Sequence, residues 1–121
     1  MDTQMFCEKM LEFLPSTLQE YEESVECYGE LLGTIVIEDI YMKEVVRLLK
    51  ENEDKKLLTQ LFDFFEYAIE NGDQQLEWDI TVTVMEILGN DKRVLEVART
   101  YMGEKSYNLQ IEADRGLGRI K

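Results

Sequence analysis

Apolar side chains recur along this chain at steps of three and four residues, which is the period of an amphipathic helix. Residues 2–14 show the period first, with Phe6, Met10 and Phe13 on one side. This helix is expected to end near Pro15, where a second helix begins, because proline is tolerated in a first helical turn. The inward face of the second helix is predicted to consist of Leu18, Tyr21, Val25 and Tyr28.

The segment DKKLLTQLFDFFEYAIENG carries the broadest apolar stripe and predicts a long, largely buried helix. Asp54 stands where an N-cap is expected, and Gly72 stands at the end. Asp73 and Asp91 are predicted to cap the two helices that follow. The apolar stripe consists of Leu57, Leu58, Leu61, Phe62, Phe65, Ala68 and Ile69.

Two stretches have a second interpretation. Residues 34–37 are a β-branched run that is either extended or an irregular crossover before a helix from about Asp39, and local pattern leaves this open. Residues 78–84 alternate apolar and polar side chains, as a strand does. A helix is favoured there, because the helical period persists from Leu76 to Leu88 between two stop and start signals.

Helices of about 12–18 residues joined by short loops pack as antiparallel neighbours. The sequence therefore predicts an all-α fold of five to seven antiparallel helices, arranged as a bundle or a short HEAT-like stack. We expect one helical domain over residues 1–115, with a weak last helix, and a flexible C-terminal tail over residues 116–121, which contain two glycines.

Charge is the strongest compositional signal. Among 121 residues, 26 acidic side chains oppose 13 basic ones, a net charge of −13. Residues 1–54 hold 14 of the acidic side chains and 4 of the basic ones. Such a field repels nucleic acid and anionic membranes, so an electrostatically steered partner should be basic.

The acidic side chains gather in QEYEESVECYGELLGTIVIEDIY, residues 19–41, which contains seven acidic residues and no Lys or Arg. The predicted helix leaves most of them outward. Trp78 falls off the apolar stripe of its own helix, and exposed tryptophan is common at interface hot spots. The candidate partner-binding residues are Glu22, Glu23, Glu26, Glu30, Glu38, Asp39, Tyr41 and Trp78.

Little in the chain suggests catalysis. It has no histidine, which removes the commonest general base and most zinc sites, and it has no glycine-rich phosphate loop. We therefore expect no catalytic, cofactor-binding or metal-binding residues and no enzyme activity. Cys7 and Cys27 are expected to be free and buried, with a disulfide as the alternative. The N-terminus lacks the pattern of a secretory signal, so a cytoplasmic location is expected.

Three segments, YGELLGTIVIEDIYMKEVVRLLKEN, LLTQLFDFFEYAIENGD and TVTVMEILGNDKRVLEVARTYMG, together resemble a family of small, acidic, all-α bacterial proteins. The family is uncharacterised in name and is often met among immunity proteins of polymorphic toxin systems. The resemblance covers about residues 15–105 and implies the fold better than the activity. It assigns no functional residues.

Charge and resemblance together predict an immunity protein that binds a cognate basic toxin, most concretely a nuclease-type toxin, and occludes it with an acidic face. The alternative is a helical adaptor or self-associating structural protein whose acidity serves solubility. Neither nucleic acid nor a membrane is expected as a partner.

Overall fold

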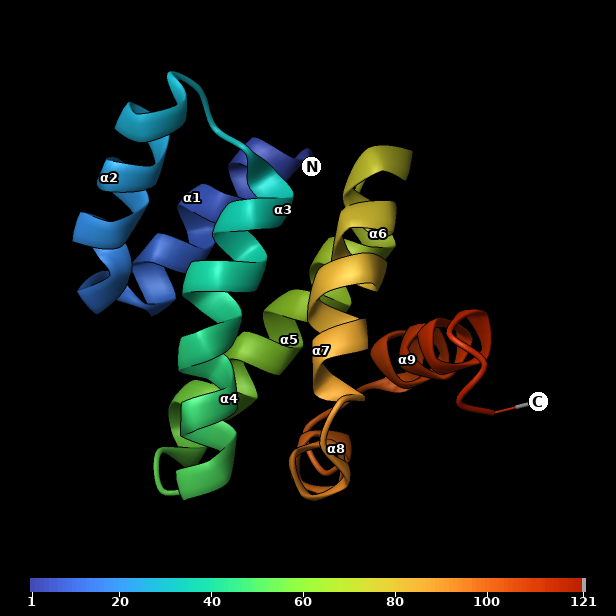
Figure 1. Cartoon of the computed structure of the whole chain (residues 1–121). Helices are drawn as coiled ribbons and strands as arrows, with labels where there is room; N and C mark the ends of the chain where they lie inside the picture. Colours follow the sequence, from blue (N-terminus) through green and yellow to red (C-terminus); the bar gives the residue numbers. More distant parts are fainter. Residues whose placement is uncertain (121) are drawn as a thin grey trace.

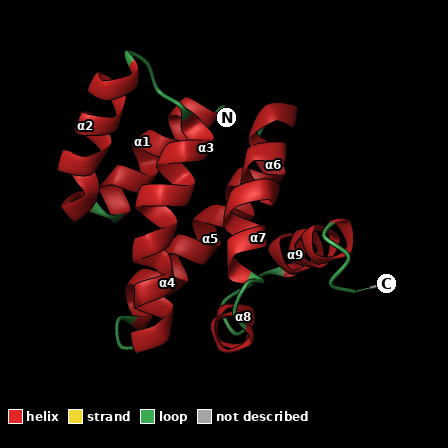
Figure 2. Ribbon diagram, viewed as in Figure 1, coloured by secondary structure: helices red, strands yellow, loops and turns green. Residues whose placement is uncertain are grey.

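The computed structural model describes residues 1–120, which contain nine α-helices and no strand (Figures 1 and 2). Because π-helical turns join α3 to α4 and α6 to α7, these helices form seven continuous segments, and the all-α prediction is confirmed. The bounds are α1 Thr3–Phe13, α2 Leu18–Tyr28, α3 Gly33–Val36, α4 Met42–Glu51, α5 Lys55–Asn71, α6 Gln74–Ile80, α7 Glu86–Leu88, α8 Lys92–Arg99 and α9 Glu104–Gly116.

Helix α5 connects the α3–α4 segment to the α6–α7 segment along the chain. In Figure 1 the α3–α4 segment and the α6–α7 segment stand side by side and run in the same direction, and α5 returns behind them. The π-helical turns of the two segments, Ile37–Tyr41 and Thr81–Met85, are in contact. Helices α8 and α9, beside the end of α7, point toward the viewer, so they are steeply inclined to the two front segments. Helix α2 lies at the outer edge, beside α1 and α3.

Aspartate side chains begin the helices where the sequence predicts them. The carboxylates of Asp54, Asp73 and Asp91 accept the backbone N–H groups of Leu57, Leu76 and Val94. This satisfies donors that have no partner within the first helical turn. Gly29 ends α2 with a φ of 73°, a conformation that glycine adopts without steric cost.

Both ambiguous stretches are helical. Residues 34–37 belong to α3 and its π-helical turn, and the strand interpretation of residues 78–84 is wrong. A π-helical turn contains an extra residue, which rotates the inward face of the helix. Ile80, Thr83, Val84 and Met85 are all buried in this part of the helix.

An aromatic cluster from α1 and α5 occupies the core. The ring of Phe6 stacks on Phe64 with 5.2 Å between centroids, and the rings of Phe62 and Phe65 meet edge to face at the same separation. Cys7 is buried as predicted, but Cys27 is exposed. Within the predicted tail, Arg119 donates to the carboxylate of Asp114 at 2.9 Å, and Lys121 lies outside the described residues.

No helix within residues 1–120 combines the length and the apolar character needed to cross a membrane.

Candidate partner-binding surface

Helix α2 is attached to the molecule without burying any of its eleven residues. Tyr21 and Val25 are half-buried, as expected for its inward side, but Leu18 is 47% exposed and Tyr28 is 53% exposed. The prediction that these two side chains face the core is therefore wrong. The helix lies at the edge of the fold, where no further helix covers its outer half.

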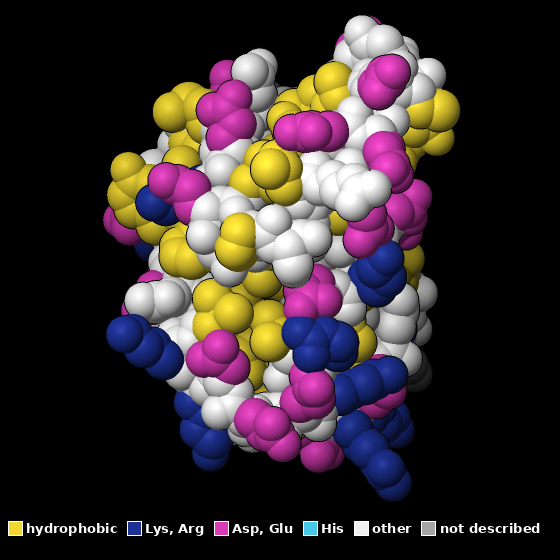
Figure 3. Space-filling view, turned by 90° about the vertical axis from the view of Figure 1, so that its left-hand side faces the viewer, with side chains coloured by type: hydrophobic (Ala, Val, Ile, Leu, Met, Phe, Trp, Pro, Cys, Tyr) yellow, Lys and Arg dark blue, Asp and Glu magenta, His cyan; other side chains and the backbone are white. Residues whose placement is uncertain are grey.

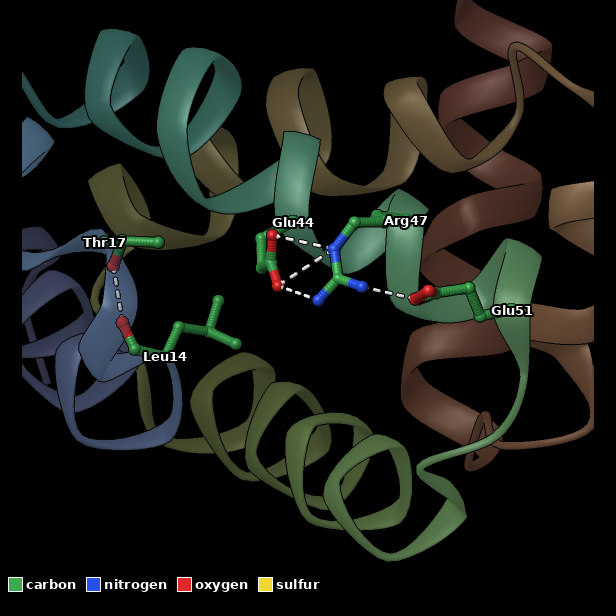
Figure 4. Close-up of polar contacts among 5 residues, drawn as sticks. All are labelled: Leu14, Thr17, Glu44, Arg47 and Glu51. Carbon is green, nitrogen blue, oxygen red and sulfur yellow. Dashed lines mark hydrogen bonds and ion pairs between the residues drawn. The ribbon is translucent and has the colours of Figure 1, made fainter.

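Two local contacts hold α2 in place. The 3-10 turn Pro15–Thr17 leads into it, and the Thr17 hydroxyl donates to the Leu14 carbonyl at 2.6 Å (Figure 4). The ammonium group of Lys43 on α4 lies 2.9 Å from a carboxylate oxygen of Glu20. Both side chains of this pair are about half exposed, so the pair contributes little to stability but joins α2 to α4.

An open groove of about 320 Å³ runs between α2 and the α3–α4 segment and is named here the acidic groove. Three carboxylates line it, those of Glu20, Glu23 and Asp39. Its remaining lining is mostly apolar or weakly polar and includes Tyr28. Carboxylates beside apolar surface suit the charged head and aliphatic stem of a lysine or arginine side chain. The other lining residues are Ser24, Cys27, Ile35 and Ile40.

The structure divides the predicted acidic set. Of its members, Glu23 and Asp39 line the acidic groove. Glu22, Glu26 and Glu30 are exposed on α2 and the loop after it but do not line the groove. Glu38 lines a different groove, along α4. Glu20 was left out of the predicted set, although it stands three residues before Glu23 and thus on the neighbouring part of the same helical face.

Tyr41 is not a surface residue. Its side chain is 0% exposed, and its hydroxyl donates to the carbonyl oxygen of Cys7 on α1 at 2.8 Å. Burial raises the pKa of Tyr41, so the phenol stays protonated and able to donate. Tyr41 ends the π-helical turn that contains Glu38 and Asp39, and the geometry of that turn directs it to the opposite side. A side chain buried in this way does not reach the surface that a docking partner would contact.

Trp78 is 57% exposed, in agreement with its position off the apolar stripe. It lies on α6, which packs on α1 and α5, and it is not part of the lining of the acidic groove. In Figure 1, α3 stands between α2 and α6. Trp78 therefore belongs to a separate part of the surface.

A larger open groove of about 510 Å³, named here the α4 groove, lies along α4. Met42, Val46 and Ile87 supply apolar side chains to it. The guanidinium group of Arg47 lies between the carboxylates of Glu44 and Glu51 (Figure 4). The hydrogen bond and charge of Arg47 hold the pKa of Glu44 below its usual value. The charged lining residues are Glu38, Lys43, Arg47, Lys50 and Glu51.

Neither groove has the arrangement of a metal site. Within residues 1–120, no three or more Asp, Glu or Cys side chains are placed to hold a metal ion together. The carboxylates of the acidic groove come from two helices and face solvent. This arrangement suits the binding of a protein surface, because several separated charges meet a complementary set on a partner.

The fold and its grooves define a small, acidic all-α protein with open grooves on its surface. The chain belongs to the family described as "Domain of unknown function (DUF7674)", whose model matches residues 7–118. The match confirms that an uncharacterised family covers most of the chain. Comparison with curated proteins and with solved structures found no match.

Proposed function

We propose that this chain is a non-enzymatic binding protein that neutralises a basic partner, most concretely an immunity protein against a nuclease-type toxin. Its acidic groove receives basic side chains from the partner, and the body of the domain then covers the partner's cationic cleft. Nuclease clefts are cationic because they bind phosphates, so an acidic helix competes for the same surface. Inhibition by occlusion requires no catalytic residue.

The observation that supports this proposal best is the exposure of α2. A helix usually gains its stability by burying an apolar face, because short isolated helices are marginal in water. Helix α2 buries none of its residues fully: Tyr21 packs partly against the core, and the preceding turn and one ion pair supply further contacts. The core therefore offsets only part of the entropy lost on ordering this helix. Binding to another molecule is a role that explains both its exposure and its five carboxylates, Glu20, Glu22, Glu23, Glu26 and, just beyond it, Glu30.

The charges within the acidic groove favour rapid and selective association. Each ion pair between a groove carboxylate and an exposed cation of the partner contributes about 0.2–1 kcal/mol to the binding free energy. Ion pairs that lose water on docking contribute more. The net charge of −13 adds long-range attraction for a basic protein. Association should therefore slow steeply as salt increases.

The test is titration calorimetry with the polypeptide encoded by the adjacent gene, at about 50 mM and about 300 mM salt. The test variant is Glu23→Lys with Asp39→Lys, which reverses two charges in the acidic groove. We expect the Kd to rise by about 10–100-fold in this variant, because like charges then face each other across the interface.

The matched control is Glu70→Lys with Glu112→Lys, which changes the net charge equally on α5 and α9 and leaves the acidic groove intact. We expect it to weaken binding much less. The proposal fails if no complex forms, or if both variants bind as the unmodified protein does. Equal weakening by both variants would show that only the net charge matters and would overturn the assignment of the groove.

A further inference from the structure

The chain turns back toward the body of the molecule after α9, in residues 117–120, which are named here the strap. Gly118 has a φ of 74°, a conformation that glycine adopts without steric cost. Its N–H donates to the carbonyl of Arg115 at 3.0 Å, and the N–H of Arg119 donates to the carbonyl of Asp114 at 2.9 Å. This pair of bonds ends a helix in the Schellman arrangement and sets the direction in which the strap leaves α9.

The side chain of Arg119 reaches from the strap to the turn between α7 and α8. Its Nη1 atom donates to the Asp114 carboxylate at 2.9 Å and to the Glu86 carbonyl at 3.1 Å. Its Nη2 atom donates to the side-chain oxygen of Asn90. The Asp114 side chain is only 8% exposed, so its charge is largely shielded from water and depends on Arg119 for a partner.

Gly89 makes room for this contact. A Cβ at this position would lie 2.4 Å from both Nη1 of Arg119 and Oδ1 of Asp114, a distance that real Cβ atoms do not reach. It would also lie 2.9 Å from Nε2 of the buried Gln110. The φ of Gly89 is −79°, which other residues adopt freely. Glycine is therefore required here for the close approach of Arg119 and Asp114 rather than for the backbone conformation.

The strap forms one wall of an open pocket of about 380 Å³ between α8 and α9, named here the α8–α9 pocket. Arg119 and Ile120 line it from the strap, and Leu95 and Arg99 line it from α8. Ile120 and Leu117, the apolar residues of the strap, both remain exposed. Burial of apolar side chains therefore does little to hold the strap in place, and the contacts of Arg119 hold it instead.

We propose that Arg119 is a latch: it holds the strap against the turn between α7 and α8, and its release opens the α8–α9 pocket while the rest of the domain stays folded. Local openings of this kind require less free energy than global unfolding, and here the hydrogen bonds of one side chain separate the two states. In the open state, solvent reaches Asp114 and Leu95, both nearly buried in the closed state. The latch thus controls access to the pocket.

This device goes beyond the proposed function and does not depend on it. Figure 3 shows the side of the molecule on which α2 lies, where Asp and Glu side chains are spread among apolar ones. In Figure 1, α9 and the strap lie at the opposite edge of the molecule from α2. Opening of the pocket is therefore tested without any partner protein and without a change in the acidic groove.

Amide hydrogen exchange of the full chain, followed residue by residue by NMR, tests the latch. Arg119→Ala removes the guanidinium group, and Gly89→Ala displaces it while every charge is kept. In both variants the amides of Asn90 and Gly118 should exchange about tenfold faster or more, because the hydrogen bonds to a charged group that hold the two turns together are lost. Arg115→Ala, which removes an exposed arginine at the end of α9, is the matched control and should leave both amides unchanged. Amides of α5 should keep their protection in all three variants.

Thiol reactivity measures the opening of the pocket itself. Leu95→Cys, in a Cys27→Ser background, places a reporter in the pocket wall, and adding Arg119→Ala should raise its rate of reaction with Ellman's reagent about tenfold or more. Circular dichroism checks that each variant folds, and the exchange experiment contains no core substitution. The proposal is overturned if the thiol rate does not change, since Arg119 then does not control access to the pocket. It is also overturned if Arg119→Ala and Gly89→Ala leave amide exchange unchanged, or if they accelerate exchange equally in α5, because Arg119 then supports the whole fold.

Discussion

Glu66 on α5 caps a helix that begins 38 residues later, and its removal should destabilise the whole fold. Gly103 precedes α9 and offers no side-chain cap. The carboxylate of Glu66 takes this role, accepting the backbone N–H of Lys105 at 2.6 Å and that of Ser106 at 2.9 Å. The perturbations are Glu66→Ala, which removes both acceptors, and Glu66→Gln, which removes the charge and keeps one acceptor.

The magnitude follows from these two hydrogen bonds and from the helix dipole. Loss of an N-cap costs about 1 kcal/mol, and loss of a negative charge at a helix N-terminus costs about 0.3–1 kcal/mol more. We therefore expect the free energy of unfolding to fall by about 2 kcal/mol for Glu66→Ala and by about 1 kcal/mol for Glu66→Gln. For a chain of 121 residues these losses lower Tm by about 8 °C and about 4 °C.

The stabilisation that Glu66 provides should weaken at low pH. Burial raises the pKa of Glu66, but the N–H groups of Ser106 and Lys105 outweigh burial, so its pKa lies below the usual 4.5. A carboxyl whose folded pKa is depressed stabilises the protein above its unfolded pKa and loses that effect as pH falls through the folded value. The difference between the unmodified protein and Glu66→Gln should therefore be full at pH 7 and shrink below about pH 4.5.

Urea denaturation followed by circular dichroism, at about pH 7 and about pH 3.5, measures both effects. Gly103→Ala provides an independent check, because an added Cβ would lie 2.6 Å from the carboxyl carbon of Glu66 and would displace it. Glu70→Ala, on the same helix and exposed, is the matched control and should change stability by less than about 0.5 kcal/mol. Equal stability of Glu66→Gln and the unmodified protein at pH 7 would refute the cap.

Two further outcomes follow from buried groups near α1. Only one thiol of the folded protein, that of Cys27, should react with Ellman's reagent at about pH 8. Cys7 is buried, and burial together with the nearby Asp79 charge raises the pKa of the Cys7 thiol to about 12. Rapid reaction of two thiols, or of any thiol after Cys27→Ser, would contradict this. Tyr41→Phe removes the hydrogen bond to Cys7 and should lower the free energy of unfolding, measured by urea denaturation, by about 1 kcal/mol. Partner binding should be unchanged. Weaker binding at unchanged stability would show that Tyr41 contacts the partner.

The helices were accessible from sequence because their determinants are local. Apolar spacing marked α5, and Asp54, Asp73 and Asp91 marked the starts of α5, α6 and α8, since a cap requires only a side chain and the N–H groups two or three residues ahead. The π-helical turns were missed, because one extra residue within a helix leaves no separate signal in the apolar pattern.

The candidate surface was accessible only in part. The sequence indicated an acidic face and an exposed Trp78, but it placed Tyr28 in the core and Tyr41 on the surface, the reverse of the structure. Helical period states which residues share a face. Whether that face is covered depends on where the other helices lie.

By itself, the sequence determined the all-α class, the main helices, most of their caps and the excess of negative charge, because each depends on residues close together in the chain or on composition alone. The tertiary structure decided which helix remains uncovered, which carboxylates meet in one groove, and that Glu66 caps α9. These features join residues from distant segments, and their positions follow from the packing of the whole core rather than from any local pattern.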